Sequence, residues 1–309
     1  MKATRDSFGE EIAVLGELHP EIVVLDADLS KSTKSEKFAK KFPNRFFQMG
    51  IAEANMIGTA AGLALSGKLP YACSFGCFLT GRYDQIRMSV AYNEASVRLI
   101  GTHAGVAIGE DGHSQMGLED VALLRSLPNM SIFQPADDTE ARAMLRYSVK
   151  HQGPCYFRLT RQKLPDIFSG ADYSYEYGKW PVLNKGSRVA LIASGGLVGS
   201  CLEANKKLGG KFSVVNASTL KPVDRDLIAR LAQTHSLLVT AEDHYVEGGL
   251  GTAVAEVLSE IPEKAILRRI GMRRFGESGS PEDLYRFFGF DADGICEQVE
   301  KFQELVSNS

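Results

Sequence analysis

The feature that most constrains the fold is an alternation of short apolar runs with segments of helical periodicity. Runs typical of buried parallel strands occur at 21–28, 70–75, 97–103, 131–136 and 154–159, and again at 188–196, 212–218, 236–244 and 265–271. Such alternation favours parallel sheets covered by helices. Residues 169–186 lose the apolar periodicity. We therefore predict an α/β protein with domains at 1–168 and 187–309 joined by a linker.

Composition argues against several classes of protein. Hydrophobic residues make up 44% of the 309-residue chain and charged residues 24%, and 35 Lys and Arg against 38 Asp and Glu give a net charge of −3. This balance indicates neither a nucleic-acid-binding surface nor a membrane-binding one. Residues 1–16 lack the apolar centre of a signal peptide, and no apolar run is long enough to cross a bilayer. We expect a cytoplasmic protein with no nucleic-acid or membrane partner.

The cysteines support the same compartment. They are odd in number and scattered: Cys73, Cys77, Cys155, Cys201 and Cys296. This pattern favours a reducing environment over a disulfide framework. Cys73 and Cys77 are spaced like half of a metal site, but no second pair of Cys or His follows at ligand spacing. We expect buried thiols and no metal site in this chain.

Glu53 stands out because its surroundings are apolar. Residues 49–67 predict a helix that is apolar around nearly its whole surface, with Glu53 near its start. A buried carboxylate is costly when ionised and unpaired, so it stays protonated, finds a cation or takes part in chemistry. The structural alternative is a residue favoured at the helix N-terminus by the helix dipole.

Other candidate residues follow the ends of predicted strands, where α/β folds bind ligands. They are Ser32, Phe75, Phe78, His103, Asp111 and Arg161. Each has a structural alternative when taken alone, such as a core aromatic, a loop histidine, a turn aspartate or a surface arginine. Their occurrence at several strand ends favours one shared cleft.

Four segments together resemble a known family. They are RFFQMGIAEANMIGTAAGLA from residue 45, CSFGCFLTGRYDQIRM from 73, GTHAGVAIGEDGHSQMGLEDVALLRSLPNM from 101 and YFRLTRQ from 156. In order and spacing they resemble the pyrimidine-binding domain of transketolase, followed by its carboxy-terminal domain. The resemblance covers essentially the whole chain. It implies a thiamine diphosphate enzyme that transfers a two-carbon ketol unit from a ketose phosphate to an aldose phosphate.

The resemblance also implies roles for individual residues. Glu53 matches the catalytic glutamate that contacts N1′ of the cofactor pyrimidine, and Phe78 matches the aromatic residue that stacks on this ring, with Phe75 nearby. Gln115 matches an active-site position beside the cofactor. The remaining matches are substrate ligands: Arg5, Ser32, His103 and Arg161 for the phosphate, with His103 also catalytic, and Asp111 for a hydroxyl.

One motif of complete transketolases is missing. Their first domain carries a GDG motif and a later Asn that bind Mg²⁺ and the diphosphate, whereas GEDG at 109–112 here belongs to the substrate loop. The resemblance therefore implies the second subunit of a split transketolase. The diphosphate and Mg²⁺ of the cofactor would be bound mainly by a separate partner chain. The resemblance further implies an A₂B₂ assembly in which two B chains pair, with residues 241–258 as contributors.

Two departures from the family leave alternatives open. His113 replaces the usual proline of the substrate loop, and Gly81 falls where relatives carry tyrosine or arginine. Both put acceptor preference in doubt. The alternative functions are the beta subunit of a 2-oxoacid dehydrogenase, a relative of deoxyxylulose-phosphate synthase, or a non-catalytic assembly subunit.

Overall fold

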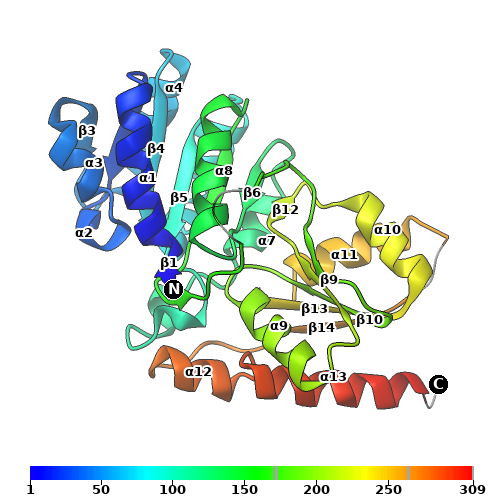
Figure 1. Cartoon of the computed structure of the whole chain (residues 1–309). Helices are drawn as coiled ribbons and strands as arrows, with labels where there is room; N and C mark the ends of the chain where they lie inside the picture. The colour runs from blue at the N-terminus through cyan, green and yellow to red at the C-terminus, as the bar shows by residue number, and fades with distance from the viewer. Residues whose placement is uncertain (169, 171–172, 263–264, 308–309) are drawn as a thin grey trace.

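The strands form two main sheets, one built mostly from the first half of the chain and one from the second half (Figure 1). The structure, a computed structural model, describes residues 1–168, 170, 173–262 and 265–307. Within these residues there is a seven-stranded sheet, a five-stranded sheet and a small pair in which β1 (Lys2–Ala3) runs antiparallel to β8 (Lys163–Leu164). The predicted α/β fold class is confirmed.

The larger sheet has the strand order β12-β6-β7-β5-β4-β2-β3. Its strands are β2 (Ile22–Asp26), β3 (Phe46–Gln48), β4 (Leu69–Phe75), β5 (Arg98–Thr102), β6 (Ser131–Phe133), β7 (Cys155–Arg158) and β12 (Thr219–Lys221). Neighbours are parallel except β12, which is antiparallel to β6. Alternate side chains of β2 enter opposite cores, Val24 on one face and Val23 on the other. This strand is therefore buried on both faces, as its apolar run predicts.

Helices cover both faces of this sheet (Figure 1). α1 (Thr4–Leu18) and α8 (Asp138–Lys150) pack on one face, and α4 (Glu53–Leu65) and α7 (Asp120–Arg125) pack on the other. The shorter helical segments are α2 (Ser30–Thr33), α3 (Glu36–Lys41), η1 (Pro43–Arg45), α5 (Gly76–Thr80), α6 (Tyr83–Gln85), η2 (Ile86–Ala91), η3 (Val106–Ile108) and η4 (His113–Gln115).

Helix α4 differs from its prediction in two respects. It begins at Glu53 and not at residue 49, and it is buried on one face only. Met56 and Ile57 lie in the core, whereas Leu65 is 64% exposed. A helix lying on a sheet presents one stripe to it, and the described residues leave the outer side of α4 open to solvent.

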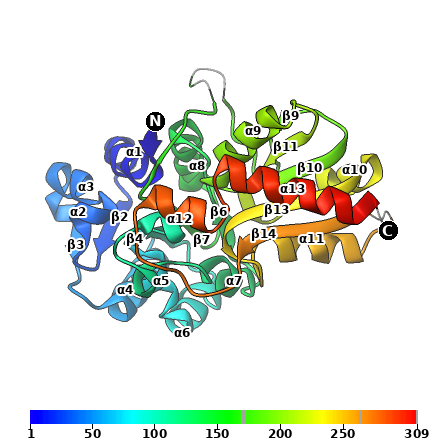
Figure 2. The ribbon, with the colours of Figure 1, turned by 90° about the horizontal axis from the view of Figure 1, so that it is seen from below.

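The second sheet has the order β14-β13-β10-β11-β9. Its strands are β9 (Val182–Asn184), β10 (Arg188–Ala193), β11 (Ser213–Asn216), β13 (His235–Tyr245) and β14 (Ile266–Met272), all parallel to their neighbours except β9. α9 (Leu197–Lys207) and α13 (Ala292–Ser307) cover one face, and α10 (Arg225–Thr234) and α11 (Leu250–Ser259) cover the other. α12 (Pro281–Phe287) lies against the first domain (Figure 2) and bonds to it through Tyr285 and Gln162.

The predicted linker is packed rather than free. It contains β9, which pairs with β11, and Trp180 is buried with its indole Nε1 donating to the Thr219 carbonyl at 2.8 Å. Thr219 begins β12, so the chain returns to the first sheet after entering the second domain. Residues 169, 171 and 172 lie outside the described residues. The limits 1–168 and 187–309 remain predictions.

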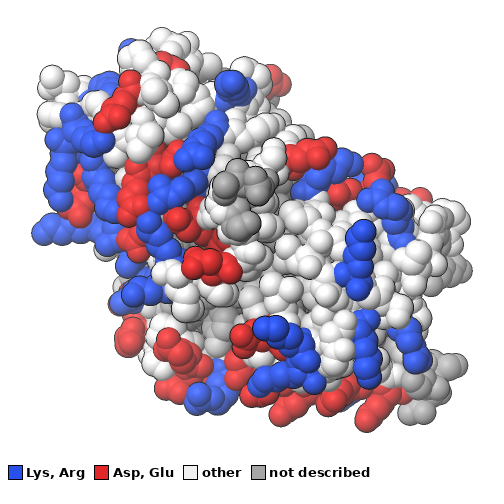
Figure 3. Space-filling model, in the orientation of Figure 1, with Lys and Arg blue, Asp and Glu red and all other residues white. Residues whose placement is uncertain are grey.

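Charges of both signs are interspersed over α1, α3 and α8 (Figure 3). Glu10 on α1 pairs there with Lys2, Lys37 and Arg142. Among the helices that the structure describes, none is long and apolar enough to span a membrane.

Candidate functional site

Parallel strands bring the predicted site residues to one edge of the larger sheet. β2, β4, β5 and β7 are mutually parallel, so their carboxyl ends meet at the same edge. The segments that follow these strands carry Ser32, Phe78, His103 and Arg161, and Phe75 is the last residue of β4. The contacts described below show which of these side chains meet.

Arg5 and His103 form the centre of the cluster. Arg5 Nη1 donates to His103 Nε2 at 2.6 Å and to the Ser32 carbonyl at 3.1 Å. Because a guanidinium only donates, Nε2 is the acceptor, and the ring proton on Nδ1 points to Thr102 Oγ1 at 2.8 Å. Burial, with smaller contributions from Arg5, Arg161 and Lys34, lowers the pKa of His103 to about 3. The imidazole is therefore neutral at physiological pH.

Arg5 keeps unused hydrogen-bonding capacity. Its Nε is buried and has no hydrogen-bond partner among the described residues. Burial lowers the pKa of Arg5, and the nearby charge of Arg161 lowers it further, although Asp6 opposes them. Two cationic side chains thus lie close together at this edge, an arrangement suited to an anion.

Asp26 holds the segment that contains α2 and Ser32. Its Oδ1 accepts from Leu29 N at 2.6 Å, and its Oδ2 accepts from Thr33 Oγ1 at 2.7 Å and Ser35 Oγ at 2.8 Å. Burial raises the pKa of Asp26, although these bonds oppose the rise. The sequence analysis missed Asp26. An aspartate ending a strand before a Ser/Thr-rich loop is a recognisable turn pattern that could have identified it.

The aromatic candidates stack in series. The Phe75 and Phe78 rings lie 5.4 Å apart at 9°, and Phe75 also stacks on His103 at 3.8 Å. Phe75 is buried and Phe78 is partly exposed, so Phe78 offers aromatic surface at the edge of the site.

Glu53 is buried at the first position of α4. Ser74 Oγ donates to its Oε1 at 3.1 Å, and no described residue bonds its Oε2. The Ser74 carbonyl in turn accepts from Thr102 Oγ1 at 3.4 Å, and Thr102 contacts His103. A chain of hydrogen bonds therefore connects Glu53 with the Arg5 cluster. The sequence analysis missed Ser74 and Thr102, whose part in this chain depends on contacts between strands.

Arg161 and Asp111 contact each other. Arg161 Nη1 donates to Asp111 Oδ2 at 3.3 Å and to the Ile108 carbonyl at 2.5 Å, and both side chains are partly exposed. Gln115 lies in η4, where its carbonyl accepts from Cys77 Sγ at 3.2 Å. The loop bearing Asp111 and Gln115 is thus tied to both Arg161 and α5.

The two departures from the family pattern lie in different surroundings. His113 contacts the second domain: its Nδ1 accepts from Gly276 N at 3.0 Å, and its ring lies 4.6 Å from that of Phe275. Gly81 is the C-cap residue that follows α5, and a Cβ added there would lie 3.0 Å from the Cys77 carbonyl.

The sequence analysis missed a buried polar network next to the loop that bears Asp111 and Gln115, which it contacts through the Gly117 carbonyl. Arg158 Nε donates to both carboxylate oxygens of Asp120, at 3.1 and 2.9 Å, and Arg158 Nη2 donates to the Asp243 carbonyl at 2.8 Å. Tyr156 and Tyr285 complete it by donating to Asp120 and Asp243 respectively. Because Asp243 and Tyr285 come from the second domain, the network joins the two domains next to the site.

All five cysteines are free thiols: Cys73, Cys155 and Cys201 are buried, and Cys77 and Cys296 are partly buried. Among the described residues, no group of three or more His, Cys, Asp or Glu side chains is placed to hold a metal ion.

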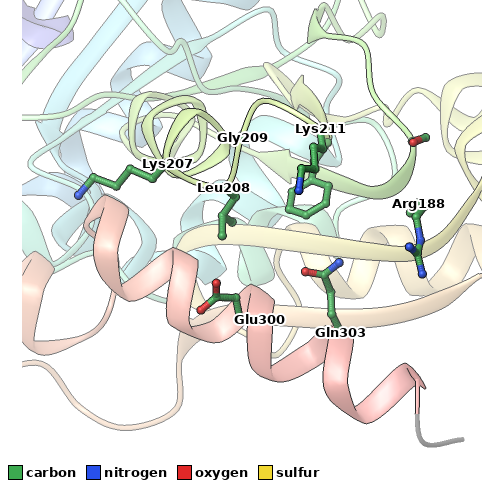
Figure 4. Close-up of a pocket in the computed structure, with 9 residues that line it drawn as sticks. Arg188, Lys207, Leu208, Gly209, Lys211, Glu300 and Gln303 are labelled. Atoms are coloured by element: carbon green, nitrogen blue, oxygen red, sulfur yellow. The ribbon is translucent and has the colours of Figure 1, made fainter.

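A cavity of about 620 Å³ lies in the second domain, apart from the predicted site residues (Figure 4). Arg188 and Lys211 line it together with Glu300 and Gln303 of α13. None of the predicted site residues borders this cavity.

Comparison with known proteins identifies the family. Residues 1–166 match the family described as "Transketolase, pyrimidine binding domain", and residues 178–295 match "Transketolase, C-terminal domain". The chain belongs to the transketolase family. It has the pyrimidine-binding domain and the C-terminal domain of transketolase. These matches favour transketolase over the alternative enzymes.

Its relatives include separately encoded transketolase subunits. The "Putative transketolase C-terminal section" of Methanocaldococcus jannaschii is 40% identical over 96% of this chain and 95% of its own length. The "6-deoxy-6-sulfo-D-fructose transketolase subunit SqwH" of Clostridium sp. is 37% identical over 97% and 94%. A solved structure described as "Split gene transketolase, inactive beta4 tetramer" is 43% identical, with a TM-score of 0.90 over 97% of this chain and 98% of that one.

Full-length transketolases are matched over part of their length. The chain spans about half of human transketolase, covering 48% of it at 36% identity. It therefore aligns with one portion of a complete transketolase.

Proposed function

We propose that this chain is the B subunit of a thiamine diphosphate-dependent transketolase. The enzyme would break the bond beside the carbonyl carbon of a ketose phosphate and join the released two-carbon ketol unit to the aldehyde carbon of an aldose phosphate. The observation that supports this most is Glu53, a buried carboxylate bonded to Ser74, the residue before Phe75, in a chain of the transketolase family.

The residues around Glu53 fit the pyrimidine ring of the cofactor. Ser74 uses only Oε1, which leaves Glu53 Oε2 available to a ring nitrogen. Phe78 offers a flat apolar surface for stacking, and Gln115 would lie beside the cofactor. Glu53 would hold a proton at N1′ of the pyrimidine. When bound, thiamine diphosphate supplies the electron sink for carbon–carbon cleavage.

The cationic cluster fits the phosphate of a sugar phosphate. Arg5 and Arg161 supply forked donors, and Ser32 lies in α2 with its carbonyl bonded to Arg5. Neutral His103 accepts from Arg5 and so orients it toward the substrate. Asp111 would accept from a substrate hydroxyl once Arg161 turns from it to the phosphate.

The rest of the cofactor site would come from a partner chain. That chain would bind the diphosphate and supply most of the Mg²⁺ ligands. The assembly would be A₂B₂, and residues 241–258 would contribute to the pairing of the two B chains. The open outer face of α4, with Leu65 64% exposed and Ile51 before the helix 85% exposed, supports a partner there. The relative described as an inactive β₄ tetramer is consistent with a B chain that needs a partner.

Reconstitution tests the proposal. Ketol transfer from a ketose phosphate to ribose 5-phosphate is measured for this chain, for a diphosphate-binding subunit and for their mixture, each with thiamine diphosphate and Mg²⁺. A sulfosugar donor is assayed in parallel, because the SqwH relative is named for one. Activity should appear only in the mixture, with the mass of an A₂B₂ complex by light scattering. A fully active preparation of this chain that mass spectrometry shows to be free of partner would contradict the proposal.

A further inference from the structure

The substrate loop, residues 105–117, depends on contacts outside itself for its position. Its only helical turns are the short segments η3 and η4. Three of its residues adopt positive φ, namely Gly105, Gly109 and Gly112, at +89°, +89° and +76°. A backbone with such freedom has many conformations to lose, so neighbouring elements must select one.

The second domain supplies several of these contacts. At the start of the loop, Val106 N donates to the buried Asp243 Oδ1 at 2.9 Å. Near its end, Gly276 N donates to His113 Nδ1 at 3.0 Å, and the Phe275 and His113 rings lie 4.6 Å apart at 55°. We call His113, Phe275 and Gly276 the latch. Because Nδ1 accepts, a neutral ring carries its proton on Nε2.

One contact from the first domain, that of Arg161, is exchangeable. Arg161 bonds to Asp111 and to the Ile108 carbonyl, but it is partly exposed and is the side chain assigned above to the substrate phosphate. If Arg161 turns to the phosphate, the tie to Asp111 is lost as the substrate binds. The latch then remains as the contact nearest to Asp111 in sequence. The two ends of the loop stay held by the Val106 bond to Asp243 and by the bonds that Cys77 Sγ and Arg158 Nη2 donate to the Gln115 and Gly117 carbonyls.

We propose that His113 is a positioning residue through which the second domain places Asp111 for the aldose acceptor. This inference rests on the proposed function. Histidine supplies both an acceptor nitrogen and a ring at this position, whereas the proline expected there from the family resemblance has no side-chain acceptor. The latch therefore affects acceptor affinity rather than the cleavage of the donor.

Three variants separate the two parts of the latch. His113→Ala removes the acceptor and the ring, His113→Phe keeps a ring for Phe275 without the acceptor, and His113→Asn keeps an acceptor for Gly276 N without the ring. His19→Ala is the matched control, since the His19 ring pairs with Glu21 in the first domain, outside the loop. Hydrogen exchange of peptides covering 105–117 is measured on the full chain, and acceptor and donor kinetics are measured on the reconstituted complex.

In His113→Ala, loop exchange should quicken and the KM for the aldose should rise about three- to tenfold, as expected for one lost hydrogen bond, with kcat and donor KM nearly unchanged. His113→Asn should bring both the loop exchange rate and the aldose KM most of the way back to wild type. His19→Ala should change neither the exchange rate nor the KM. Loop exchange and aldose KM equal to wild type in His113→Ala would overturn the inference. Exchange is read without partner or substrate, so an inactive wild-type complex would contradict the proposed function and leave the loop measurement valid.

Discussion

Two arginine–aspartate pairs near the end of β7 differ in their burial, and the difference indicates different roles. Arg158 ends the strand and bonds to Asp120 through Nε, and the side chains are 2% and 0% exposed. Arg161, three residues later, reaches Asp111 at 3.3 Å with side chains 37% and 42% exposed. The chemical groups are the same in both pairs, and only their surroundings differ.

The buried pair is fixed and the exposed pair is exchangeable. Removing either member of a desolvated pair leaves a charge with no compensation, which costs several kcal/mol. An exposed pair contributes about 1 kcal/mol or less, so a phosphate can replace the aspartate at little cost. Arg158 therefore joins the domains, and we propose that Arg161 binds the substrate.

The strongest test of this contrast is the stability of Arg158→Met. Loss of the guanidinium leaves Asp120 buried without its cation, and we expect unfolding to become easier by about 3–5 kcal/mol in urea titrations. Arg161→Met, the matched control, should change stability by less than about 1 kcal/mol. If Arg158→Met does not fold, the double variant Arg158→Met/Asp120→Leu should recover folded protein. Equal stability of the two single variants would contradict the comparison.

A second test addresses the exchangeable pair. In the reconstituted complex, Arg161→Ala should raise the KM for ribose 5-phosphate about ten- to a hundredfold, because one charged hydrogen-bonding partner contributes about 1.5–3 kcal/mol. The KM for unphosphorylated glycolaldehyde should change little. Lys163→Ala, which removes an exposed charge from the same segment, is the control. Equal losses with both acceptors would show that Arg161 does not bind the phosphate.

A third test uses His103, which combines burial with neighbouring cations. Its pKa is lowered from 6.5 to about 3 in the folded chain, so between these values the unfolded chain binds the extra proton. Stability should therefore fall as pH drops below about 6.5, by about 1.4 kcal/mol per pH unit for this group. His103→Asn, which suits the positive φ of 59° here, should remove that part of the slope. Identical pH slopes by urea unfolding would contradict the burial of a neutral His103.

Long apolar runs allowed the sequence to predict most of the strands. The predicted runs contain β2, β5, β6 and β7 and all of β4 but its first residue, and those of the second half contain or overlap β10, β11, β13 and β14. The sequence did not predict β3, β9 or β12, which have three residues each and lie at sheet edges. A run of three residues is too short for periodicity, and β12 finds its partner β6 far back in the chain.

The site residues, like the strands, could be predicted only where the signal is local in the sequence. Ser32, His103 and Arg161 follow apolar strands directly, so their place at the sheet edge could be predicted from parallel topology. Arg158 was missed because its partners Asp120 and Asp243 lie 38 and 85 residues away in sequence. Burial and pairing of that kind arise only when distant segments pack together.

We infer that Glu53 activates the thiamine diphosphate, and exchange of the thiazolium C2 proton measures this activation most directly. Quenched-flow NMR on the assembled complex compares wild type, Glu53→Gln and a surface control, Glu21→Gln. The amide keeps the shape of Glu53 and loses the shared proton, so exchange should slow by about a hundredfold while assembly and the control remain normal. Unchanged exchange in a properly assembled Glu53→Gln complex would contradict a role of Glu53 in activating the cofactor.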